Sequence, residues 1–98
     1  MAGVPVDKAR ALAISRQTLS GLDARILEGV AGGLSTVQLS ARVYLSRQGV
    51  DYHISALLRR FRVSNRAALA SRAYSMGILS SGSWPPRVVP ECVDPYES

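Results

Sequence analysis

The chain has 98 residues, and its 12 Lys and Arg against 7 Asp and Glu give a formal net charge of +5. This length suits one small domain and leaves little room for a large active-site cleft. A single Cys and a single His exclude an intrachain disulfide framework and most metal centres built from these residue types. We therefore expect no metal, no cofactor and no enzymatic activity.

The first 18 residues are predicted to form an N-terminal helical extension, with a helix over 6–17 around Leu12 and Ile14. Charged residues interrupt this segment, so it lacks the apolar core of a signal peptide. No window of the sequence approaches the roughly 18 apolar residues that a membrane helix requires. A cytoplasmic location without a membrane partner is expected.

Residues 19–79 carry a net charge of +5 and read as four short helices. Ser20 is the expected cap of the first helix, with Asp23 as a shorter substitute for the Glu of a capping box. Gly32 and Gly33 are a stop signal. Ser35 is the expected cap of a second, shorter helix. Their apolar positions have helical spacing and are Leu22, Ile26, Leu27 and Val30, then Val37, Leu39 and Val43.

The third helix has the clearest pattern and is expected to begin after Ser46. Its apolar residues fall within an arc of about 100°. They are Val50, Ile54, Leu57, Leu58 and Phe61. The opposite face is polar and carries little acid, with Gln48, Tyr52, Ser55, Ala56 and Arg59. Asn65 is the expected cap of a fourth helix that ends at Gly77.

Residues 80–98 carry a net charge of −2 and four of the five prolines. This composition argues against helix and predicts an extended or mobile tail. Trp84 is a candidate to anchor the tail to the core, and Cys92 is expected to be a mobile surface thiol.

A short helix and a longer one joined by three residues predict a helix-turn-helix, in which the first helix braces the second for entry into a DNA major groove. A surface helix kept soluble by its charges is the alternative. The candidates for reading bases are Gln48, Tyr52, Ser55 and Arg59. The candidates for binding phosphates are Arg47, Arg60, Arg62 and Arg66, the last with a structural salt bridge as its alternative.

The residues that follow resemble the LuxR/FixJ/GerE-type DNA-binding domain over 19–79, in register and without a gap. They are Leu19-Ser20, Ile26-Leu27, Gly33-Leu34-Ser35, Leu39-Ser40, Val43, Leu45-Ser46, Val50, His53, Leu57, Arg60-Phe61, Val63 and Asn65-Arg66. The resemblance implies an all-α, four-helix fold with a recognition helix at about 47–62. His53 matches the family's His and has no Cys or second His nearby, so we expect a structural role for it. No catalytic triad with Ser46 or Ser55 is expected, because no carboxylate is placed to orient the imidazole.

The resemblance implies that the fourth helix often serves dimerisation. An Ala-rich stripe is expected to form the dimer interface, with Ala68, Ala70, Ala73 and Met76. The alternative is that these alanines only favour helix formation. Three positions depart from the family, and the mildest is Asp23, which stands where the family usually has Glu. Gly49 replaces a usual Thr and Asp51 a usual Lys, and Arg47 is one candidate to neutralise Asp51 from the preceding turn.

Two functions remain open. The first is a small stand-alone transcriptional regulator that binds double-stranded DNA as a homodimer, because few residues precede the domain. The alternative is a helix-turn-helix interaction module with weakened DNA contacts that binds another regulator or RNA polymerase. Gly49 and Asp51 motivate the alternative.

Overall fold

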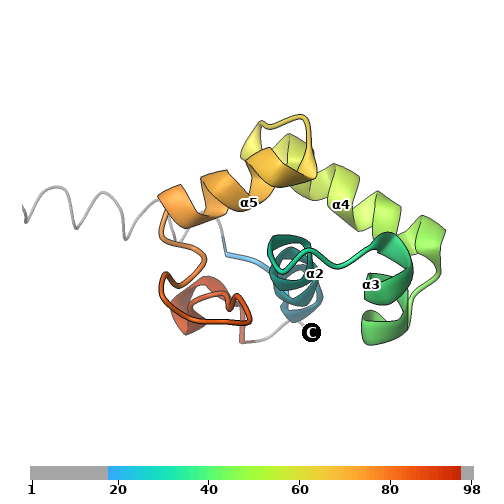
Figure 1. Ribbon diagram of the computed structural model, residues 1–98, viewed down its shortest axis with the longest axis horizontal. Coiled ribbons are helices and arrows are strands. Elements are labelled where there is room, and N and C mark those ends of the chain that lie inside the picture. The colour runs from blue at the N-terminus through green and yellow to red at the C-terminus, as the bar shows by residue number, and fades with distance from the viewer. Residues whose placement is uncertain (1–17, 96–98) are drawn as a thin grey trace, which may run out of the picture.

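The computed structural model describes residues 18–95, and in this range the chain forms four α-helices and one short 3-10 helix (Figure 1). They are α2 (Gly21–Ala31), α3 (Thr36–Val43), α4 (Arg47–Phe61), α5 (Arg66–Ser75) and the 3-10 helix η1 (Pro90–Cys92). The predicted all-α class with four helices after residue 19 is confirmed. The helix predicted over 6–17 lies outside the described residues. No helix within residues 18–95 has the length and apolarity needed to cross a bilayer.

Side chains cap the start of every α-helix in the described range, at the four predicted positions. Ser20, Ser35 and Ser46 accept a hydrogen bond from the backbone N–H three residues on, and Asn65 does the same for α5. Each bond satisfies a donor that the helix itself cannot pair. A full capping box forms only at α3, where the Gln38 side chain accepts from the Ser35 N–H at 2.8 Å.

The core is built around α2, which contacts all three other α-helices. Figure 1 shows α4 and α5 arranged above α2, with α3 beside the start of α4. Ile26 and Leu27 on α2 are fully buried, as are Leu39 on α3, Val50 on α4 and Leu69 on α5. These helices bury one apolar face each, so the hydrophobic effect fixes which face of α4 remains outside.

Gly29 permits the close approach of α3 to α2. A Cβ atom at this position would lie 2.2 Å from Leu39 Cδ2 and 3.2 Å from Leu34 Cδ1. Both neighbours belong to the packed core region, so a larger residue would push α3 outward. The position of α3 matters because α3 supports the first turns of α4.

The tail after α5 packs on α2 and closes the core. Pro86, Val88 and Cys92 are buried, and the Leu19 N–H donates to the Cys92 carbonyl at 2.8 Å. The expectation of a mobile surface thiol is therefore wrong, because Cys92 is fully enclosed. The proposed anchor is also wrong, because Trp84 is 77% exposed. The anchoring residues are small, and the tail makes isolated bridges rather than an α-helix.

Candidate nucleic-acid interface

A tight turn joins α3 to α4 and sets the angle between them. Tyr44 ends α3 in the left-handed region with φ 60°, a conformation that few residues other than Gly adopt. The Ser40 hydroxyl, on the last turns of α3, donates to the Leu45 carbonyl and closes the turn. Leu39 and Val43 bury the inner side of α3. The pair thus has the brace and the projecting helix of a helix-turn-helix.

One face of α4 is held in the core and the other is open. Val50, Ile54, Leu57 and Phe61 are buried on the inner face. The four predicted base-reading residues are all exposed, and they are Gln48, Tyr52, Ser55 and Arg59. They are spaced by four, three and four residues, so about 100° per residue places them along one stripe of the helix. We call these four residues the α4 stripe.

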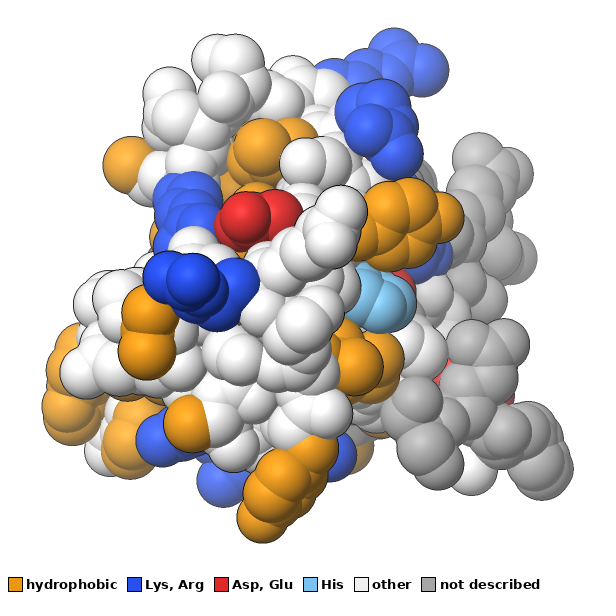
Figure 2. All heavy atoms as spheres, turned by 90° about the vertical axis from the view of Figure 1, so that its right-hand side faces the viewer, with side chains coloured by type: hydrophobic (Ala, Val, Ile, Leu, Met, Phe, Trp, Pro, Cys, Tyr) orange, Lys and Arg blue, Asp and Glu red, His pale blue; other side chains and the backbone are white. Residues whose placement is uncertain are grey.

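A contact between α2 and α4 orients the middle of the α4 stripe. His53 Nδ1 lies 3.0 Å from Asp23 Oδ1, and both side chains are about a quarter to a third exposed. The Tyr52 ring meets the His53 ring edge to face, with 5.6 Å between centroids. This pair links α2 to α4 and gives Tyr52 a support. The histidine is pale blue in Figure 2.

The contacts of Asp23 contradict two expectations from the sequence. Its carboxylate contacts the imidazole of α4, whereas the capping pattern had assigned it to the start of its own helix. The statement that no carboxylate orients His53 is likewise wrong. Within residues 18–95, however, no serine hydroxyl hydrogen-bonds to this imidazole, so the contact joins two helices rather than activating a nucleophile.

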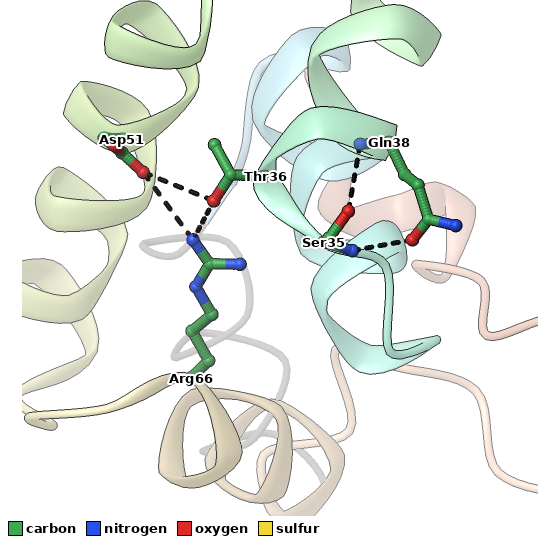
Figure 3. Close-up of polar contacts among 5 residues, drawn as sticks. All are labelled: Ser35, Thr36, Gln38, Asp51 and Arg66. Atoms are coloured by element: carbon green, nitrogen blue, oxygen red, sulfur yellow. Dashed lines mark hydrogen bonds and ion pairs between the residues drawn. The ribbon is translucent and has the colours of Figure 1, made fainter.

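Arg66 joins three helices at the side of α4 (Figure 3). Its Nη2 donates to Thr36 Oγ1 at 2.5 Å and lies 3.6 Å from Asp51 Oδ1. The Thr36 hydroxyl also lies 3.5 Å from the same carboxylate oxygen. The partner of Asp51 is therefore Arg66 from the first turn of α5, and the suggested neutralisation by Arg47 is not what the structure contains. The structural alternative for Arg66 accounts for its contacts.

The other arginines of α4 and its C-terminal cap differ in whether they already contact another residue. Arg60 donates to the Thr18 carbonyl at 2.5 Å, which directs it toward the start of the described chain. Arg47, Arg59 and Arg62 are exposed, and none of them makes an ion pair with another residue between 18 and 95. Figure 2 shows this side of the molecule, where blue cationic side chains lie beside a red acidic one. The surface near the α4 stripe is basic.

The predicted dimer residues on α5 do not form one stripe. Ala73 is fully buried in the core, so its assignment to an outer contact surface is wrong. Ala68 and Ala70 are two residues apart, which places them on nearly opposite sides of the helix. Ala68 and Met76 line one shallow hollow on the outer side of α5, together with Val63, Ser71, Arg72 and Ser75.

A braced helix with an open polar face and a basic surround defines a helix-turn-helix protein of the nucleic-acid-binding class. The sequence matches the family described as bacterial regulatory proteins, luxR family, over residues 17–73. The chain belongs to this family, whose helix-turn-helix domain binds DNA in transcription regulation. No curated protein and no solved structure matches the chain.

Proposed function

We propose that the chain is a sequence-specific transcriptional regulator that binds double-stranded DNA as a homodimer, with residues 47–62 in the major groove. The observation that carries this proposal is the α4 stripe, which is exposed along its length while the opposite face is fixed in the core. A rigid helix with projecting hydrogen-bonding groups can read base edges without reordering.

The side chains divide into two roles. Gln48 can form two hydrogen bonds with adenine and Arg59 can do so with guanine, whereas Ser55 and Tyr52 offer single hydroxyl contacts. Arg47 and Arg62, near the two ends of α4, are free to bind phosphates, since such contacts need only charge and reach. Arg60 and Arg66 contribute charge, but their contacts with Thr18 and Thr36 restrict their reach.

The homodimer is proposed to form through the outer side of α5, at the hollow that Ala68 and Met76 line. Two-fold symmetry would place two recognition helices about one DNA turn apart, roughly 34 Å. Sedimentation of the purified protein tests this part. Ser71→Arg adds a bulky charge to the hollow and is expected to shift the protein to monomer, whereas Ser81→Arg, an exposed change in the tail, is not.

Selection of duplexes from a random pool, followed by fluorescence anisotropy, tests DNA binding. Affinity for the selected duplex should fall as salt rises from about 50 to 200 mM, because binding releases counterions from the DNA. Arg59→Ala should weaken it by about 1–3 kcal/mol and relax the preference at one base pair. Arg25→Ala is the matched control, because it removes the same charge from an exposed position on α2.

The alternative is an interaction module that binds another regulator or RNA polymerase. It predicts equal affinity for selected and scrambled duplexes, or no binding at any salt concentration. Either result would overturn the proposal. The pairing of Asp51 with Arg66 favours DNA binding, because it offsets the negative charge that had motivated the alternative.

A further inference from the structure

Asp51 borders the α4 stripe and is the exposed acidic residue on that helix. It lies three residues after Gln48 and four before Ser55, so it is a neighbour of both on the helix surface. Its side chain is 63% exposed. Base pairs that contact Gln48 or Ser55 would therefore lie close to this carboxylate.

The two oxygens of Asp51 are not equivalent. Oδ1 faces Thr36 Oγ1 at 3.5 Å and Arg66 Nη2 at 3.6 Å, whereas Oδ2 makes no hydrogen bond or ion pair with any other residue of the described chain. The contacts come from α3 and α5, so the carboxylate is tethered from the side away from the stripe. One acceptor is thus held in place and the other is open to solvent.

Arg66 removes the main objection to an acid on this surface. An isolated carboxylate beside DNA phosphates would be repelled, but a guanidinium at 3.6 Å offsets its charge locally. Arg66 is 38% exposed on its side chain and also donates to Thr36, so its position is fixed by two partners. The cluster is close to neutral and still presents a strong acceptor.

The chemistry of a single open acceptor selects among the base edges. In the major groove, guanine presents only acceptors and thymine presents an acceptor and a methyl group. Adenine has an amino donor next to the N7 acceptor, which would repel a carboxylate. Cytosine carries its N4 amino group next to C5–H rather than next to an acceptor of the same base, and Asp and Glu accept from this amino group. We propose that Asp51 reads a cytosine in the bound DNA, with Arg66 as the residue that positions its carboxylate. This inference depends on the DNA-binding function proposed above.

Selection from a random duplex pool with the wild type and two variants tests the proposal. The wild type should yield a column dominated by cytosine beside the positions that respond to Gln48→Ala and Ser55→Ala. Asp51→Ala should make that one column degenerate and leave the others intact. Asp51→Asn should remove the preference for cytosine, because the open atom becomes an amide N–H donor, which cannot accept from the N4 amino group.

Anisotropy with the selected duplex gives the size of the effect. Replacing the cytosine pair by a thymine pair should weaken wild-type binding about tenfold and leave Asp51→Ala nearly unchanged. The asparagine variant retains the size of the side chain, so it serves if the alanine variant does not fold, as circular dichroism would show.

Failure of the proposed DNA-binding function and failure of the proposed role of Asp51 would give different results. If the wild type selects no sequence, the DNA-reading function itself is wrong. If the wild type selects a sequence and neither variant changes a cytosine column, only the role of Asp51 is wrong. Arg66→Gln adds a further check, because loss of the positioning guanidinium should weaken the cytosine preference as well as the overall affinity.

Discussion

Gly49 stands in the first turn of α4, where its N–H donates to the Ser46 hydroxyl at 3.0 Å. A Cβ atom there would lie 3.3 Å from that hydroxyl oxygen and 3.6 Å from Leu45 Cβ. A Cβ atom at this position would fit after a small shift of the Ser46 side chain. No positive φ requires glycine at this position, since the backbone is helical.

Gly49→Ala should therefore stabilise the protein, by about 0.5 kcal/mol, because alanine loses less backbone entropy than glycine on entering a helix. Urea unfolding followed by circular dichroism measures the change. Gly33→Ala is the contrasting variant, since φ is +83° there and a side chain would be strained. A drop in stability for Gly49→Ala would mean that the Ser46 cap cannot give way.

The sequence shows where Asp51 stands, but not what it contacts. Spacing along one helix points to Arg47, the cation four residues earlier. The actual partner, Arg66, is fifteen residues further along and reaches Asp51 only because α5 packs against α4. The pair Asp23–His53 spans thirty residues and was missed for the same reason. Contacts made through tertiary packing leave no periodic signal in a single sequence.

At the scale of elements, local signals predict helix starts well and helix faces less well. The caps at Ser20, Ser35, Ser46 and Asn65 were predicted because a cap is recognised within three residues of its own bond. The face of α4 was predicted because its large apolar residues mark the core side. The face of α5 was assigned wrongly at Ala73, because an alanine fits equally well in a core and on a surface.

The capping box of α3 should contribute to the stability of the fold. Ser35→Ala removes the acceptor for the Gln38 N–H, which lies 3.1 Å from the hydroxyl, and should cost about 1 kcal/mol of folding free energy. The urea midpoint of the variant reports this loss. Ser81→Ala, an exposed serine in the tail, should leave the midpoint unchanged. Equal midpoints for the two variants would show that α3 is held by packing alone.

For the whole molecule, the tail decides how the core is closed. Its prolines correctly argue against an α-helix, but they do not argue against packing, because an irregular segment can still bury side chains. Val88 and Cys92 are buried, and the Val88 N–H donates to a carboxylate oxygen of Glu28 on α2 at 2.8 Å. Burial of small apolar groups at irregular spacing has no pattern that a single sequence reveals.

The enclosure of Cys92 makes stability depend on pH in alkaline solution. Burial raises the pKa of the thiol above its ordinary 9.0, and the negative charge of Glu91 raises it further. Well below pH 9 the thiol is neutral in both the folded and the unfolded state and does not make the stability depend on pH. As pH rises beyond 9, the unfolded chain releases this proton more readily than the folded one, so the folded state loses stability until the folded pKa is passed.

Thermal unfolding at pH 8 and pH 10 should therefore show a larger fall in midpoint for the wild type than for Cys92→Ala. The comparison uses the fall rather than the midpoint itself, because the alanine variant also leaves a small cavity that lowers stability at every pH. Other groups that titrate in this pH range are common to both proteins, so their effects on the two falls in midpoint cancel. The same fall in both would mean that the tail opens readily and exposes the thiol, contrary to the packed arrangement in which Leu19 and Val93 are bridged.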